Sequence, residues 1–237
     1  MVSIMEEKIN RYLAPYHWAI EGFYLRRYER PVKLILNQFN SNDVVLDAGS
    51  GDGRLTAMIA GRVKRITGID KQKLPLEFAR IIFDELKIKN AEFKIGDILN
   101  LARFKDKSFD KITCFDVIEH VPREKAEEAI KHFSRMLKEN GKLYLTTPNR
   151  DELSGRIFGH KIEDKHYYEY NVRELVDLFK PHFKNIKVNG YYIQLIPKAG
   201  RYPDVFPFKT IFNFLINAGL NKPEWCYGIL IQGEKKQ

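Results

Sequence analysis

The sequence predicts an α/β fold: a Rossmann-like, doubly wound, mostly parallel seven-stranded sheet with helices on both faces and a mainly helical, aromatic cap. Between residues 42 and 147, short apolar runs rich in β-branched residues alternate with longer segments of helical periodicity, which is typical of repeated βαβ units. A glycine-rich turn follows the first of these runs, where the chain passes from a strand into a helix. The length of 237 residues suits one such domain with a substantial cap.

The strands are predicted from short apolar runs, each followed by polar or glycine-containing turn residues. They lie at 44–46, 65–69, 91–95, 111–115, 142–146, 185–193 and 225–232. An amphipathic helix is predicted over 126–137, because apolar residues recur there at helical spacing between Pro122 and Gly141. A further helix is predicted at 172–179, ended by Pro181.

Three segments lie outside this alternation: 1–40, about 148–170 and about 194–222. We predict that 1–40 forms an N-terminal helical cap and that 41–237 forms the main domain, with the other two segments inserted in it as parts of the cap. The first and third segments are rich in aromatic residues. These residues indicate either helices packed on the sheet or a lid over an apolar or aromatic ligand.

Composition excludes a disordered chain, and no run of apolar residues is long enough for a membrane span. Forty Lys and Arg against 31 Asp and Glu give a formal charge of +9, which would attract anionic partners. A second interpretation is that the dense charges of both signs form surface ion-pair networks suited to high temperature. Two cysteines cannot build a disulfide framework, and the first residues do not resemble a signal peptide. A cytoplasmic location is expected.

The motif that carries chemistry is the glycine-rich turn, in which Gly49, Gly51 and Gly53 let a ligand approach main-chain N–H groups at a helix N-terminus. Its G-x-G-x-G spacing differs from the G-x-G-x-x-G of dinucleotide-binding folds. The acids Asp47 and Asp52 would repel a pyrophosphate. A cationic ligand is therefore favoured.

This turn resembles the first motif of the class I S-adenosylmethionine-dependent methyltransferases, whose D-x-G-x-G-x-G loop lies against the amino-acid part of the cofactor. Residues 109–122 resemble the family's fourth-strand motif, and residues 136–143 resemble its turn from a helix into the fifth strand. The resemblance covers about residues 43–149. It implies S-adenosylmethionine as cofactor, with S-adenosylhomocysteine as product.

Other segments are most similar to the small-molecule branch of the family, which includes quinone-biosynthesis O-methyltransferases. They are Glu119-His120-Val121-Pro122, Thr147-Pro148-Asn149-Arg150 and His166-Tyr167. The resemblance implies methyl transfer to the oxygen or nitrogen of a small acceptor, and the aromatic cap favours an apolar or aromatic one. A monomer or a homodimer is expected.

The resemblance also implies a set of cofactor-binding residues. They are Asp47, Gly49, Ser50, Gly51, Gly53, Asp70, Lys71, Asp97, Ile98 and Phe115. Asp70, at the end of the second strand, is placed to accept both ribose hydroxyls. Asp97, after the third strand, is placed to accept an adenine amino hydrogen, with Ile98 over the ring.

Methyl transfer from a sulfonium is an in-line displacement, so alignment in a dry pocket contributes much of the catalysis. A base helps when the acceptor is a hydroxyl of high pKa. The candidates for catalysis or for orienting the acceptor are His120, His166 and Tyr167, although His120 equally fits a helix N-terminus or a cofactor contact. No metal is predicted, because His160 and His166 lack a partner at ligand spacing.

Three alternatives remain. An RNA methyltransferase would need clustered basic and aromatic residues, for which Arg26-Arg27-Tyr28-Glu29-Arg30 is the best candidate, although a solvated helix face explains that segment more simply. Nucleic acid is therefore possible but not favoured as a partner. The chain could instead bind the cofactor without catalysing transfer. A nicotinamide dehydrogenase is disfavoured by the glycine spacing.

Overall fold

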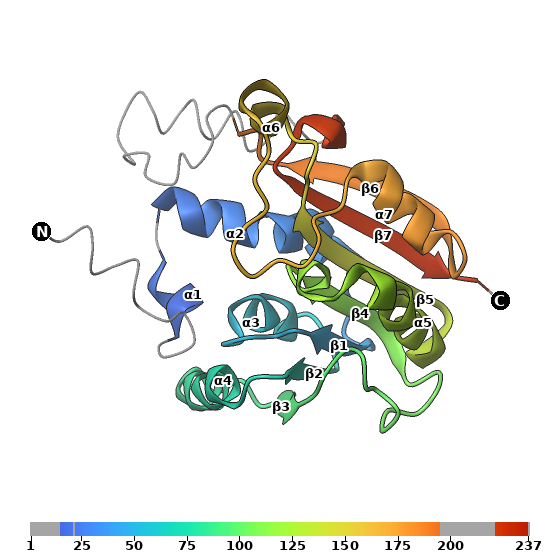
Figure 1. The fold of residues 1–237 in the computed structure, drawn as a ribbon. Coiled ribbons are helices and arrows are strands. Elements are labelled where there is room, and N and C mark those ends of the chain that lie inside the picture. The colour runs from blue at the N-terminus through green and yellow to red at the C-terminus, as the bar shows by residue number, and fades with distance from the viewer. Residues whose placement is uncertain (1–14, 21, 195–220, 237) are drawn as a thin grey trace, which may run out of the picture.

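The computed structural model describes residues 15–20, 22–194 and 221–236, which build a seven-stranded sheet with the order β3-β2-β1-β4-β5-β7-β6 (Figure 1). The strands are β1 Val44–Ala48, β2 Arg65–Asp70, β3 Ala91–Ile95, β4 Phe109–Phe115, β5 Leu137–Pro148, β6 Phe183–Tyr191 and β7 Gly228–Lys235. Only β7 runs against its neighbours, pairing antiparallel with β5 and β6. The predicted fold class is confirmed.

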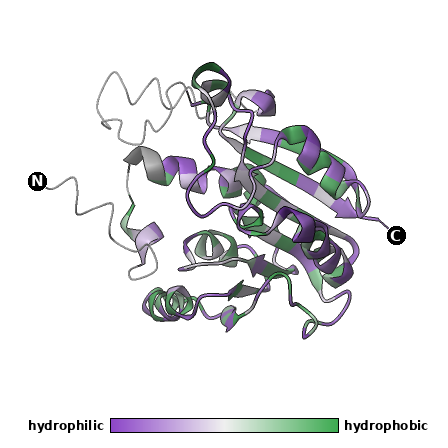
Figure 2. Cartoon of the chain, viewed as in Figure 1, coloured by the Kyte–Doolittle hydropathy of each residue, from purple (hydrophilic) through white to green (hydrophobic). Residues whose placement is uncertain are grey.

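Helices cover both faces of this sheet. The longer ones are α2 Gly22–Ile35, α3 Arg54–Ala60 and α4 Lys73–Glu85 on one face, and α5 Ala126–Met136 and α7 Val172–Phe179 on the other. Two short helices are α1 Tyr16–Ala19 and α6 Leu153–Phe158. In Figure 2 the apolar colour follows the strands and the parts of the helices that face them.

The alternation of side chains along each strand builds two cores. In β5, Leu143 and Leu145 pack with α5 and α7, whereas Tyr144 between them packs with α2 and α3 on the opposite face. All three side chains are fully buried. A continuous apolar run is therefore what a strand covered on both faces requires.

The last two strands lie a few residues away from their predicted positions. The left-handed backbone of Tyr192, with φ +75°, follows the end of β6. Pro223 begins a short 3₁₀ helix before β7, which delays the start of that strand. Strand β5 is longer than predicted at both ends. Leu137, predicted as the last residue of the preceding helix, pairs instead with Phe109 of β4, and the pairing with β7 continues to Pro148.

The described part of the N-terminal segment contributes to the sheet's packing. Val32, Ile35 and Phe39 are buried in one core together with residues of α3 and α4. Residues 1–14 and 195–220, which hold much of the predicted cap, lie outside the described residues. The division at residue 40 stays a prediction. Among the described residues, no helix combines the length and the apolar character that a membrane crossing requires.

The start of α7 is defined by a capping box. The Asn171 side chain accepts a hydrogen bond from the Glu174 N–H at 2.9 Å, and the Glu174 carboxylate accepts one from the Asn171 N–H at 3.2 Å. The helix predicted over 172–179 is confirmed, since α7 begins and ends at these residues.

We expect Asn171→Ala to lower the free energy of unfolding by about 1 kcal/mol, because the N–H of Glu174 loses its side-chain acceptor. Urea denaturation of the variant measures this loss. Arg173→Ala, in the same turn but with an exposed side chain, is the control and should change stability little. An equal loss in both variants would show that the cap contributes nothing.

Candidate active site

The candidate site lies at the carboxyl ends of the parallel strands, where the strand order reverses between β1 and β4. Open α/β sheets bind their ligands in the crevice at such a point. In Figure 1, β7 runs to the right, so the parallel strands end at the left, on the side where α1 lies. The predicted residues that follow β1, β2 and β4 are thereby brought to one edge.

The glycine-rich turn has the conformation for which its glycines were predicted. The φ angles of Gly49, Gly51 and Gly53 are +85°, +53° and +80°, which side chains with a Cβ rarely adopt. A Cβ on Gly49 would also lie 2.1 Å from Cγ2 of Val117. A Cβ on Gly51 would meet only His17 Cε1, at 4.0 Å, among the described residues, so this side of the turn has room for a ligand.

Asp47 supports the turn from beneath. Its side chain is buried, with 3% of the residue exposed, and its two oxygens accept hydrogen bonds from Thr56 Oγ1 and Thr113 Oγ1 at 2.5 and 2.8 Å. Burial raises the pKa of this carboxyl, and the two hydroxyl donors oppose the rise. The described contacts of Asp47 are thus internal, and they link the end of β1 to α3 and β4, while its predicted contact with the cofactor stays a prediction.

Asp70 lies beside the turn at the end of β2. Its carboxylate accepts hydrogen bonds from the Gly51 N–H at 3.1 Å and from the Gln72 N–H at 2.8 Å. Burial raises the pKa of Asp70, and these two hydrogen bonds oppose the rise. Lys71, the next residue, is exposed. One carboxylate therefore links the second strand to the glycine-rich turn.

The remaining predicted cofactor residues differ in accessibility. Asp97 is exposed, and its side chain accepts a hydrogen bond from the Leu99 N–H at 2.9 Å, as in a local turn. Ile98 is buried in the core beneath α5, and Phe115 is buried in the core on the opposite face of the sheet. Ser50 is buried within the turn, and its Oγ has no hydrogen-bond partner among the described residues.

Helix α1 lies over the turn. The N–H of His17 and the indole N–H of Trp18 donate to the Oδ2 and the main-chain oxygen of Asp52, both at 2.8 Å. The His17 ring stacks on Tyr28 with centroids 4.5 Å apart, and the Arg54 guanidinium lies over the Trp18 ring at 5.0 Å. The sequence analysis left this aromatic segment open between packed helices and a lid, and these contacts show that α1 packs on the glycine-rich turn.

Asp116, at the end of β4, is a residue to which the sequence analysis gave no role. It has a left-handed backbone with φ +52°, unusual for a residue other than glycine. Its N–H donates to Thr146 O at 3.1 Å, and its carboxylate accepts from Thr146 Oγ1 at 2.8 Å. Such strained residues concentrate at functional sites, and the strain itself leaves no signal in the sequence.

The predicted catalytic residues are only partly brought together. The rings of His120 and His166 meet edge to face with centroids 4.8 Å apart, and burial lowers the pKa of His120. Tyr167 is 67% exposed, and its contact with this group is a main-chain hydrogen bond to Glu119 O at 2.8 Å. Glu119 itself, with 1% of its surface exposed, was not predicted as a site residue.

Comparison with known proteins agrees with this geometry. A family model described as a methyltransferase domain matches residues 39–206, and the chain belongs to this family. The predicted membership of the class I methyltransferase superfamily is thereby confirmed, and the cofactor that goes with it is S-adenosylmethionine.

Relatives and solved structures add detail. Ubiquinone biosynthesis O-methyltransferases of Idiomarina loihiensis and Acinetobacter baylyi are 36% and 32% identical over 107 and 110 residues, covering 45% and 46% of this chain. The chain spans 43% and 45% of their lengths, less than half of each relative.

Two solved structures share the fold. The PH0226 protein from Pyrococcus horikoshii has a TM-score of 0.67 at 18% identity, covering 98% of this chain and 99% of that chain. A SAM-dependent methyltransferase from Archaeoglobus fulgidus has a TM-score of 0.63 at 17% identity, covering 90% and 99%.

Proposed function

We propose that the protein is a methyltransferase that uses S-adenosylmethionine and acts on a small acceptor. The observation that carries this proposal is that two features lie side by side. The turn has room for a ligand at Gly51, and the Asp70 carboxylate lies within hydrogen-bond distance of the Gly51 N–H. Ser50 Oγ, buried without a described partner, adds a polar atom that a ligand would satisfy. The cofactor, when bound, supplies a methyl group on a positively charged sulfur.

The residues of the chain have distinct tasks in this proposal. The N–H groups of the turn and the carboxylate of Asp70 hold the amino-acid and ribose parts of the cofactor. Helix α1, fastened to Asp52, excludes water from the turn. His120 and His166 face the acceptor and orient it, while Asp97 and Ile98 keep their predicted roles at the adenine. Alignment of the acceptor is the main contribution to rate.

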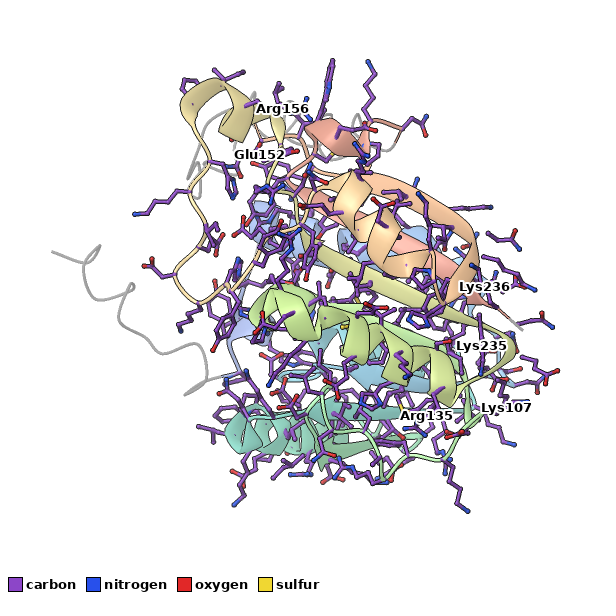
Figure 3. All side chains as sticks on the ribbon, turned by 45° about the vertical axis from the view of Figure 1, so that its right-hand side comes forward. Lys107, Arg135, Glu152, Arg156, Lys235 and Lys236 are labelled. Atoms are coloured by element: carbon purple, nitrogen blue, oxygen red, sulfur yellow. The ribbon has the colours of Figure 1, made fainter. Side chains whose placement is uncertain are left out.

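A small acceptor is favoured over RNA by the placement of the basic residues. Figure 3 shows Lys107, Arg135 and Lys235 at the end of the sheet opposite α6, which carries Arg156. Lys107 and Arg135 each form an ion pair with an acid. These cations therefore do not extend the candidate site as an RNA-binding surface would.

The basic segment Arg26-Arg27-Tyr28-Glu29-Arg30 is also not a purely solvated helix face. The Arg27 guanidinium lies over the ring of Tyr227 at 4.9 Å and over that of Tyr192 at 5.8 Å. For Arg27 the interpretation as a solvated residue is wrong, because tyrosines near the chain's C-terminal strand cover it. The name of the relatives, ubiquinone biosynthesis O-methyltransferase, supports methyl transfer to an oxygen of a small acceptor.

Release of S-adenosylhomocysteine tests the function. The purified chain is incubated with S-adenosylmethionine and, side by side, with small phenols, small amines or bulk tRNA. We expect release above background with a small phenol. Release with tRNA alone would reverse the choice of acceptor. Binding of the cofactor without release for any acceptor would favour a binding protein.

We further propose a cytoplasmic location and a monomeric or homodimeric state. Cys114 in β4 is a buried thiol within the core, which suits a compartment in which thiols stay reduced. Gel filtration and cell fractionation measure these properties directly.

A further inference from the structure

A compact group of three potential metal ligands lies next to the glycine-rich turn. One ligand atom each of Glu119, His120 and His166 lie within 4.8 Å of one another. Glu119 and His120 belong to a 3₁₀ turn, η4 Ile118–His120, which follows β4 directly. Val117, the residue before η4, is the one that a Cβ on Gly49 would strike, so the group adjoins the cofactor side of the site.

The hydrogen bond of His120 leaves one ring nitrogen available as a ligand. Its Nδ1 lies 2.9 Å from the main-chain oxygen of Lys165. A carbonyl oxygen only accepts hydrogen bonds, so Nδ1 must carry the hydrogen. In the neutral ring Nε2 then keeps its lone pair, as a metal-binding nitrogen requires.

His166 is held in the same way by an acid. Its Nδ1 lies 2.6 Å from Oε1 of Glu169, while Oε2 of that carboxylate pairs with His160 Nε2 at 2.7 Å. The Glu169 carboxylate thus acts as the acceptor and fixes the ring orientation of His166. A carboxylate behind the Nδ1 of a histidine is the usual support of a metal-ligating imidazole.

Glu119 is the carboxyl member of the group. It is buried, and its Oε2 accepts a hydrogen bond from Thr147 Oγ1 at 3.2 Å. A cation bound here would favour the charged form of this carboxyl, which burial otherwise disfavours. The segment that carries His166 is fastened to the same residue, since Tyr167 N and Tyr168 N donate to Glu119 O.

We propose that Glu119, His120 and His166 bind a divalent cation of the first transition row, such as Zn²⁺, and that this cation holds a hydroxyl oxygen of the acceptor. Two imidazoles and one carboxylate suit such an ion and leave a coordination position open. A hydroxyl bound to the cation loses its proton to solvent water more easily than a free one, and its oxygen is then ready to take the methyl group. The part that concerns the acceptor rests on the proposed function, whereas the cation site does not.

The sequence analysis predicted no metal because it searched for ligands at short spacing. His166 lies far along the chain from His120, and the insertion after β5 brings it back to η4. In this inference the two histidines act on the acceptor through the cation rather than as proton acceptors.

Cobalt titration of the full chain tests the site without any use of catalysis. After treatment with a chelator and dialysis, Co²⁺ should give a visible absorption band, and Zn²⁺ at about 100 times its Kd should raise the Tm by about 5–10 °C. His166→Ala and Glu119→Gln should lose both effects, whereas His132→Ala, on α5, should keep them. Glu169→Gln, which loosens the support of His166, should weaken Co²⁺ binding by about 10- to 100-fold.

Absence of the band and of the Tm shift in the unaltered chain would overturn the inference, as would their persistence in His166→Ala. Calorimetry with S-adenosylmethionine shows whether each variant is folded, and a variant that fails to bind it is replaced by His120→Ala. Cobalt binding without methyl transfer to any acceptor would leave the cation site standing and remove the proposed function. Loss of phenol methylation on chelation, restored by Zn²⁺, supports the role at the acceptor.

Discussion

Asp70→Ala is expected to weaken the binding of S-adenosylmethionine by about 100-fold. Two charge-assisted hydrogen bonds from the ribose hydroxyls would be lost, and a net loss of about 3 kcal/mol corresponds to that factor. The Gly51 N–H would also lose its acceptor, which loosens the turn against which the cofactor lies. Isothermal titration calorimetry of the purified variant measures the change in Kd.

Asp84→Ala provides the matched control, because Asp84 is an acid on α4 whose side chain is 85% exposed. Its Kd should equal that of the unaltered chain. Asp70→Asn keeps one oxygen for the Gly51 N–H but removes the charge, so its Kd should lie between those of the other two. An unchanged Kd in Asp70→Ala would remove Asp70 from the cofactor site.

Gly49→Ala is expected to have the largest effect on stability, lowering the free energy of unfolding by about 2–5 kcal/mol. The left-handed conformation at φ +85° contributes about 1–2 kcal/mol for any residue with a Cβ. The overlap with Val117 Cγ2 contributes about 1–3 kcal/mol, since the strand ends around it are closely packed. Chemical denaturation measures the total, and cofactor binding should fall with it.

Two companion variants separate the causes. Gly61→Ala is the control, because Gly61 has a helical backbone and nothing within 4 Å of the new Cβ among the described atoms. It should leave stability unchanged or slightly raised. Adding Val117→Ala to Gly49→Ala should recover the overlap part and leave the backbone part. No loss of stability in Gly49→Ala would mean that the turn adopts another conformation.

The parts of the site that are local in sequence were predictable. Gly49, Gly51 and Gly53 follow a buried strand at fixed spacing, and their positive φ angles are what that spacing requires. Asp70 was predicted because a parallel strand places its last residue at the same edge as the turn. The positions of these residues needed only the spacing of the turn and the parallel order of the strands, whereas their cofactor role came from the resemblance to the methyltransferase family.

The group around Glu119 could not be predicted in this way. Its geometry depends on how the insertion after β5 folds back, and the hydrogen bonds from Tyr167 N and Tyr168 N to Glu119 O carry no side-chain signature. The ends of β6 and β7 were misplaced for a related reason. Apolar runs continue past Tyr191 in the sequence, whereas the backbone of Tyr192 decides where pairing stops.

The fastening of α1 to Asp52 has a kinetic consequence. His17 and Trp18 hold the carboxylate and the main-chain oxygen of the same residue, directly beside the open side of Gly51. We therefore expect a molecule bound on the turn to be exchanged only when both contacts open, so that the spent cofactor would leave by the route through which the fresh one enters. On this expectation, turnover depends on how often the four-residue helix α1 detaches from Asp52.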